Sequence, residues 1–337
     1  MIRSLALHRY SGIALLLVIL VSLIVLMSCE HREFVYDLPS KRVPITVEFD
    51  WSRDPGAAPK GMTVYFFRVG SKSNSAATYD FLGRDGGSIT LSPGIYGAIC
   101  HNNDSDRHGF VGTESFDKFG IRMNDHRGAG DINNTPGVHP HNEDERIAHT
   151  PDSMWVASIQ MFEIMARDPG DTSPARPQII RFEMHPVVNH YTFHIHNPLN
   201  FNKSISVSAT ISGMAGTVHP GRGVNGEETV SHLFSMSPTA GGGLFGEILT
   251  FGHCGGDSIW SRDAEDSSVS HVLVVRAIFS NGTVWNSVHD VTDQIHGSES
   301  PDCVVELDSV AFPKSTTTEG WAPSVGGWTG SQESIGM

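Results

Sequence analysis

The chain is poor in charge, and above all in positive charge. Only 18% of its 337 residues are charged, and 37 Asp and Glu stand against 23 Lys and Arg, for a formal net charge of −14. Nucleic acids and anionic lipid surfaces attract clustered positive charge. We therefore expect no nucleic-acid partner.

Cysteine is also scarce, with Cys29, Cys100, Cys254 and Cys303 in the whole chain. No pair has the CxxC spacing of common zinc and redox sites. Cys100 ends an apolar run, which favours a buried, inert thiol. A Cys254–Cys303 or a Cys100–Cys254 disulfide is open to an exported chain, and the sequence does not choose between them.

Signatures of catalysis are missing. Neither GxSxG nor HExxH occurs. Acidic residues are numerous, but a sequence does not show whether two carboxylates face each other across a cleft, as a glycosidase requires. We predict no enzyme, no catalytic residue and no cofactor.

Histidine, by contrast, is abundant, with 18 in the chain. His139 and His141 lie in a polar segment, and His190, His194 and His196 would share one face of a strand, where imidazoles can bind zinc or copper. Nothing assigns further ligands. A solvated polar face is the favoured interpretation, and we predict no metal.

The apolar run near the N-terminus is short for a membrane span. It extends from Ile13 to Met27, 15 residues interrupted only by Ser22, whereas a spanning helix needs roughly 20. Arg3 and Arg9 precede it, which gives the layout of a secretory signal.

The signal ends in Leu-Met-Ser-Cys, which resembles a bacterial lipobox. Lipid would be attached to the thiol of Cys29, and cleavage would remove residues 1–28. The remaining 309 residues would carry a formal charge of −16, since Arg3 and Arg9 leave with the signal. We predict a membrane partner through this lipid and a polar tether over residues 29–42.

The rest of the chain has the composition of an all-β protein. It contains 35 Gly and 18 Pro, and short alternating runs predict strands joined by many turns. The clearest predicted strands cover residues 45–51, 62–69, 154–164, 180–184, 191–196, 205–211, 271–279, 291–295 and 303–307. We place a domain boundary near His185, which gives an N-terminal β domain over 43–185 and a C-terminal one over 186–337 with a flexible tail.

Two turns predict hairpins. Ser92-Pro93-Gly94 suits a type II turn between residues 89–91 and 95–99, and Asn281-Gly282 suits a type I′ turn. Residues 101–151, rich in Asn, Asp, Gly and His, are expected to be a long excursion over the surface.

Several motifs together resemble the fimbrillin-like lipoproteins of anaerobic Gram-negative bacteria, in particular an uncharacterised family of two-domain members related to anchor and tip subunits of type V fimbriae. They are spread in order over the mature chain: Val43–Trp51, Leu91–Tyr96, Thr150–Trp155, His185–Phe193, Asp290–Gln294, and Gly320-Trp321 to Gly327-Trp328.

The resemblance implies two tandem antiparallel β-sandwiches of Greek-key type, anchored in the outer membrane by lipid and facing the cell surface. Glu30 and Glu33 match only partly the acidic cluster that follows the lipidated Cys in surface-exported members. It also implies partnership with other fimbrial subunits by strand donation.

In polymerising members a protease cuts before the first core strand, and Arg42 is the candidate processing site here. We predict that this segment is retained, as in anchor subunits. The function that we favour is that of a structural or adhesive fimbrial anchor or accessory subunit. The alternative is a glycan-binding lipoprotein of a polysaccharide-uptake system, which exposed Trp321 and Trp328 would support. Trp51 and Trp285 are expected in the core.

Overall fold

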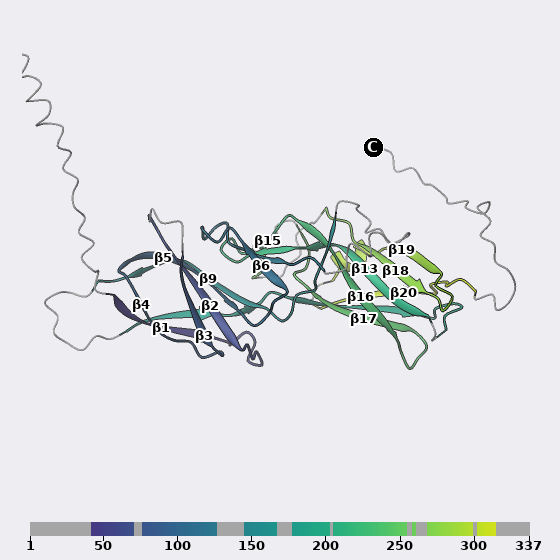
Figure 1. Cartoon of the computed structure of the whole chain (residues 1–337), viewed down its shortest axis with the longest axis horizontal. Helices are drawn as coiled ribbons and strands as arrows, with labels where there is room; N and C mark the ends of the chain where they lie inside the picture. The colour runs from purple at the N-terminus through teal and green to yellow at the C-terminus, as the bar shows by residue number, and fades with distance from the viewer. Residues whose placement is uncertain are drawn as a thin grey trace, which may run out of the picture.

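The computed structural model describes residues 42–70, 76–126, 145–166, 177–202, 205–254, 258–260, 268–298 and 302–314. Its regular structure is almost entirely β. The strands of the N-terminal half lie toward one end of the long axis of the molecule, and those of the C-terminal half lie toward the other (Figure 1). None of the helices within these ranges has the length and apolar character needed to cross a membrane. The predicted all-β class is confirmed.

The N-terminal half is a sandwich of two sheets. The three-stranded sheet has the order β10 (Gln178–Glu183), β1 (Val43–Asp50), β4 (Gly87–Leu91). The five-stranded sheet has the order β11 (His185–Pro186), β9 (Trp155–Ile164), β5 (Gly94–Asn102), β2 (Gly61–Arg68), β3 (Ala77–Leu82). Val47, Phe66 and Phe182 are buried between them, because alternate side chains of each strand point inward.

The C-terminal half is built around β16 (Thr229–Pro238). This strand pairs along most of its length with β13 (Ser206–Ala215) and at its end with β17 (Leu244–Thr250). Beyond β13 lie β18 (Val272–Ile278) and β19 (Val284–Asp290), and beyond β17 lie β12 (Asn189–His196) and β20 (Asp302–Asp308). The Phe193 and Phe234 rings meet in the core with centroids 4.6 Å apart.

Both halves use the same pairing scheme for their first long strand. β1 lies between β10, which is parallel to it, and antiparallel β4. β12 lies between parallel β20 and antiparallel β17. The β-sandwich prediction is therefore confirmed, although the sheets are mixed and not purely antiparallel as expected.

The expectation of a surface excursion over 101–151 is wrong for its described parts. They form β6 (His108–Val111), β7 (Gly120–Met123) and β8 (Arg146–Ala148). β7 and β6 join a four-stranded sheet with β14 (Thr217–His219) and β15 (Val224–Asn225), and β8 pairs with β16. Phe119 and Ile121 are fully buried, but such short apolar patterns are hard to recognise inside a polar segment.

These strands connect the cores of the two halves. Phe67 and Ile99, from β2 and β5, belong to the same buried cluster as Phe119 and Ile121 and as the C-terminal core. The Tyr65 ring adds to this contact, with its centroid 4.8 Å from that of Phe119. The outer face of the N-terminal five-stranded sheet is therefore packed against protein instead of water.

The predicted hairpin at Ser92-Pro93-Gly94 is wrong. β4 pairs with β1, whereas β5 pairs with β2 and β9, so this turn carries the chain from one sheet to the other. The Tyr96 hydroxyl donates a 2.8 Å hydrogen bond to the Ser92 carbonyl and braces the crossing. Periodicity shows that two strands follow one another, but it does not show which sheet each joins.

The Asn281-Gly282 hairpin is present, between β18 and β19, but its turn is not type I′. A type I′ turn needs a positive φ at both central residues. Gly282 has φ +81°, but Asn281 does not have a positive φ. Gly282 N–H donates to Phe279 O, and Phe279 N–H donates to Thr283 O, the pattern of a longer loop that ends in a left-handed glycine.

Residues 292–296 form a helix, α3 (Thr292–His296), where a strand was expected. Val291 and Ile295 are both buried, four residues apart, which places them on one helical face. The Gln294 side chain then bonds β20 through both Glu306 backbone groups, at 3.1 and 2.7 Å. A side chain thus takes the place of the expected strand pairing.

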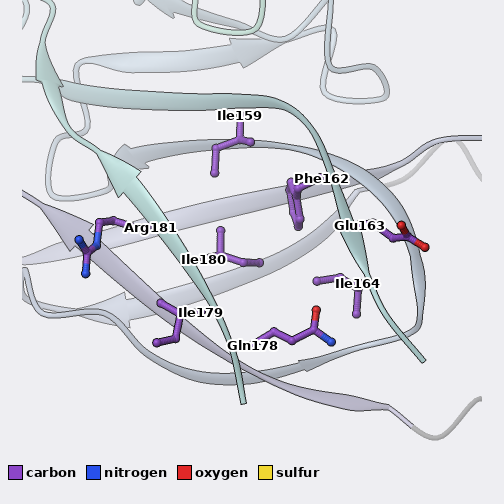
Figure 2. Close-up of a pocket in the computed structure, with 8 residues that line it drawn as sticks. All are labelled: Ile159, Phe162, Glu163, Ile164, Gln178, Ile179, Ile180 and Arg181. Carbon is purple, nitrogen blue, oxygen red and sulfur yellow. The ribbon is translucent and has the colours of Figure 1, made fainter. Parts of the chain in front are cut away.

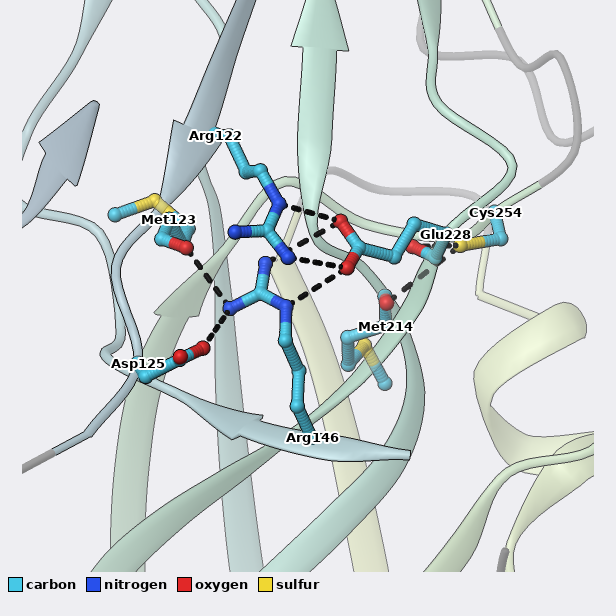
Figure 3. A network of polar contacts seen from close by, with 7 residues as sticks. All are labelled: Arg122, Met123, Asp125, Arg146, Met214, Glu228 and Cys254. Atoms are coloured by element: carbon cyan, nitrogen blue, oxygen red, sulfur yellow. Dashed lines mark hydrogen bonds and ion pairs between the residues drawn. The ribbon is translucent and has the colours of Figure 1, made fainter. Parts of the chain in front are cut away.

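Ion pairs join β7 and β8, from the described part of residues 101–151, to the C-terminal half (Figure 3). Arg122 of β7 donates to both carboxylate oxygens of Glu228, at 3.0 and 2.7 Å. Arg146 of β8 reaches the same carboxylate at 2.8 Å and also bonds Asp125. Hydrogen bonds from Arg122, and then from Arg146, lower the pKa of Glu228 to about 2.

We expect Glu228→Gln to lower the free energy of unfolding by about 1–2 kcal/mol at pH 7, measured by urea denaturation. The value is well below that of a buried pair because 38% of the Glu228 side chain is exposed. The Glu228 pKa falls on folding from 4.5 to about 2, so its contribution is full above pH 4.5 and is lost as the pH falls toward 2.

Glu183→Gln is the matched control. Glu183 pairs with Arg53 at 2.6 Å, but both side chains are about half exposed, at 52% and 53%. Such a pair contributes about 0–1 kcal/mol. Equal losses in the two variants would contradict a special role for Glu228.

Candidate functional site

Arg42, the candidate processing residue, lies at the start of the described chain. It is exposed and directly precedes β1. Cys29, the predicted lipidation site, and the tether that follows it lie outside the described residues. The part of the predicted site that the structure brings into view is therefore the junction between tether and body.

That junction leads directly into the centre of a sheet. β1 is in register with β10 from Ile45 to Asp50 and with β4 from Val43 to Val47. Its inward side chains Val43, Ile45, Val47 and Phe49 are buried. Each such side chain contributes about 1.5–3 kcal/mol through burial, so β1 is an integral part of the sandwich.

The far end of β1 is fixed as well. Trp51 is buried, as predicted, and its indole N–H donates a 2.9 Å hydrogen bond to Arg84 O. The Arg84 guanidinium lies 5.2 Å from the Trp51 ring centroid, a distance that allows a cation–π contact. A cut after Arg42 would release the tether but leave β1 attached through Trp51.

The sandwich opens into a pocket of about 210 Å³ between β9 and β10 (Figure 2). Ile159, Phe162 and Ile164 of β9 line one side, and Gln178 and Ile180 of β10 line the other. Five of its eight lining residues are apolar, and Glu163, Gln178 and Arg181 are polar (Figure 2).

The strands around this pocket have edges without a ladder partner in the part of the chain that the structure describes. β10 is the last strand of its sheet there. Within the described residues β11 pairs only with Trp155 and Val156, so the remainder of β9 has a ladder partner on one side. Ile179 and Met161 are 61% and 70% exposed there. Unpaired edges with apolar side chains can accept an added strand.

The structure does not gather the predicted histidines into a site. His190, His194 and His196 share one solvent-facing side of β12, as expected. His190 Nε2 lies 3.1 Å from Glu247 Oε2, and His196 Nε2 lies 3.4 Å from Glu306 Oε1. His139 and His141 lie outside the described residues.

The three described cysteines, Cys100, Cys254 and Cys303, are buried. Neither disulfide left open by the sequence is formed among them. Burial raises the pKa of the Cys100 thiol well above its usual range, which agrees with the predicted inert role.

The other tryptophans with a predicted role are Trp285, Trp321 and Trp328. Trp285 was expected in the core but is only partly buried, and it packs against the core with its ring centroid 5.0 Å from that of Phe312. Trp321 and Trp328 lie outside the described residues.

A second group consists of His253, His271 and His296, and no sequence pattern predicted it. One ring nitrogen from each lies within 4.8 Å of the others. The three residues come from separate segments with no motif spacing, so only the fold brings them together. We refer to them as the histidine cluster.

Comparison with known proteins gives relatives that align over most of their own length. The chain is 22% identical over 340 aligned positions to the "Putative fimbrium anchoring subunit Fim4B" of Bacteroides ovatus, covering 91% of this chain and 95% of the relative. Its fold matches the crystal structure of a "putative adhesin" from Bacteroides ovatus with TM-score 0.61 and 19% identity, over 86% and 98% of the two chains.

A further structure is that of the fimbrial anchor protein Mfa2 from Porphyromonas gingivalis, at TM-score 0.48 and 13% identity over 79% and 89% of the chains. The model of one family, described as a domain of unknown function (DUF5119), matches residues 28–235. That match covers more than half of the chain, and the protein belongs to the DUF5119 family.

Proposed function

We propose that this protein is a fimbrial anchoring or accessory subunit, without catalytic activity. Lipid on Cys29 holds it in the outer membrane, and the two β-sandwiches face the cell surface. The tether over residues 29–42 joins the lipid to the body.

The observation that carries the proposal is the position of β1. An anchoring subunit must transmit force from its tether to its body, whereas a cut after Arg42 would remove the tether and leave β1 in place. Here the tether continues directly into a central strand with partners on both sides and four buried apolar side chains. Loss of β1 would expose those side chains together with two strand edges, at a large cost in free energy.

The relatives support the same assignment. Similarity to a protein named as a fimbrium anchoring subunit extends over 91% of this chain, so it includes both sandwiches. The tether and its neighbouring Arg42 lie inside the family match, which begins at residue 28.

The next subunit would bind by strand addition at the outer edge of β10. Its backbone would pair with β10, and its apolar side chains would cover Ile179 and enter the pocket lined by Phe162 and Ile180. Glu163 and Arg181 in the pocket lining would favour a strand with charges of both signs.

We expect Cys29→Ser to abolish lipidation and membrane anchoring. Cells grown with radioactive palmitate should label the wild-type protein but not the variant, and the variant should leave the outer-membrane fraction. Cys303→Ser is the control, since this thiol is buried in the fold and should leave labelling unchanged. Equal labelling of wild type and Cys29→Ser would contradict the anchor.

We expect Ile179→Asp to reduce the fimbriae retained on cells several-fold, because a charge on the outer edge of β10 opposes an apolar strand. Val288→Asp on β19 is a matched control. Both side chains are 61% exposed and lie on edge strands, in different sheets. Fimbriae would be counted by electron microscopy at equal surface levels of anchor. Equal retention in the two variants would exclude the β10 edge as the binding site.

A further inference from the structure

We propose that the histidine cluster of His253, His271 and His296 binds a divalent transition-metal ion, best matched by Zn²⁺. The cluster lies in the C-terminal half, away from the edge of β10. It is the one group of three or more metal-ligating side chains that converge within the described residues. Three imidazoles and one open position form a recognised zinc coordination set.

The three ring nitrogens available to a metal are buried and unpartnered. They are Nδ1 of His253, Nε2 of His271 and Nε2 of His296. His271 is fully buried, and His253 is 8% exposed. A buried polar atom without a hydrogen bond costs about 1–3 kcal/mol, so three such atoms in one cluster call for a common partner.

The opposite nitrogen of His271 sets its tautomer. Nδ1 lies 3.1 Å from the carbonyl oxygen of Ser212, which can only accept, so Nδ1 carries the proton. Nε2 then presents its lone pair to the cluster. Metal-bound histidines usually hold their second nitrogen in this way, by donation to a backbone carbonyl.

The backbone around the cluster is fixed by further hydrogen bonds. His271 N–H donates to Thr292 Oγ1 at 2.9 Å, next to the helix that ends with His296. The Asn225 side chain donates to His253 O, also at 2.9 Å. The residue before β18 is therefore held to α3, and the loop after β17 is held to β15, before any ligand binds.

A divalent metal cation satisfies the nitrogens of the histidine cluster better than a water molecule does. Burial lowers the pKa values of His253 and His271 to about 4, and the neighbouring imidazoles add to this effect. Both rings are neutral at pH 7 and have lone pairs free for coordination. When all three nitrogens are unprotonated, a water molecule can donate to only two of them, whereas Zn²⁺ accepts lone pairs from all three.

Two other histidine pairs show that the large number of histidines in the chain does not by itself produce such a cluster. His194 and His196 stack on β12 with centroids 5.9 Å apart, but their side of the strand faces solvent. His101 and His108 are buried with centroids 6.1 Å apart, and no third ligating side chain joins them in the described residues. In the histidine cluster the three centroids are 5.0–5.1 Å apart.

The test uses the full chain, purified in detergent without a polyhistidine tag. After dialysis against EDTA, it is loaded with Zn²⁺ and passed through a desalting column, and metal is measured by inductively coupled plasma mass spectrometry. We expect about one Zn²⁺ per chain and a higher unfolding temperature in the loaded protein, because the ion binds only the folded state.

His296→Gln is the decisive variant, because His296 is only partly buried at the end of a short helix. It should lose the bound Zn²⁺ and the rise in unfolding temperature, while its metal-free form keeps the wild-type circular dichroism. If that form is misfolded, His253→Gln replaces it. The double variant His194→Gln, His196→Gln should keep both properties.

Co²⁺ provides an independent readout of the coordination. The wild type should show the visible absorption of a four-coordinate Co²⁺ site, and His296→Gln should not. Failure of the wild type to retain Zn²⁺ or Co²⁺ would overturn the proposal. So would equal retention by His296→Gln, or loss of metal from the β12 double variant alone.

Discussion

The seating of β1 between β10 and β4 is the constraint on which the rest of the N-terminal half depends. β1 supplies the backbone partners of both neighbours and four side chains of the core. Without it the three-stranded sheet would be two unconnected strands. The same strand is the continuation of the tether, so a pull on the N-terminus would act first on the best-paired strand of that sheet.

The second half repeats this scheme with β12 and joins the first through residues contributed by β6, β7 and β8. Phe119 and Ile121 belong to the same core cluster as Phe67 and as the C-terminal strands. The Arg122–Glu228–Arg146 contacts fasten those strands at their polar margin. Load that enters at β1 can thus pass to the C-terminal half through a packed interface as well as along the chain.

Sequence patterns predicted strands and turns, which depend on residues close together in the chain. They did not predict strand partners or side-chain contacts between residues far apart in the chain. The alternation of Ile45, Val47 and Phe49 identified β1, but not its parallel partner β10, over 120 residues away. The turn at Ser92-Pro93-Gly94 was recognisable, yet only the sheets decide that it crosses between them. Phe119 and Ile121 went unnoticed because two apolar residues give no period. The histidine cluster was hidden because its members meet only in the fold.

The central claim is that the protein reaches the cell surface with its tether and β1 intact. The most direct measurement is the intact mass of the protein taken from isolated outer membranes, with its N-terminal residue identified. The account predicts a chain that begins at a lipidated Cys29 and continues through Arg42 into β1. A lipid-free chain that begins at Val43 would contradict it and indicate a processed subunit instead.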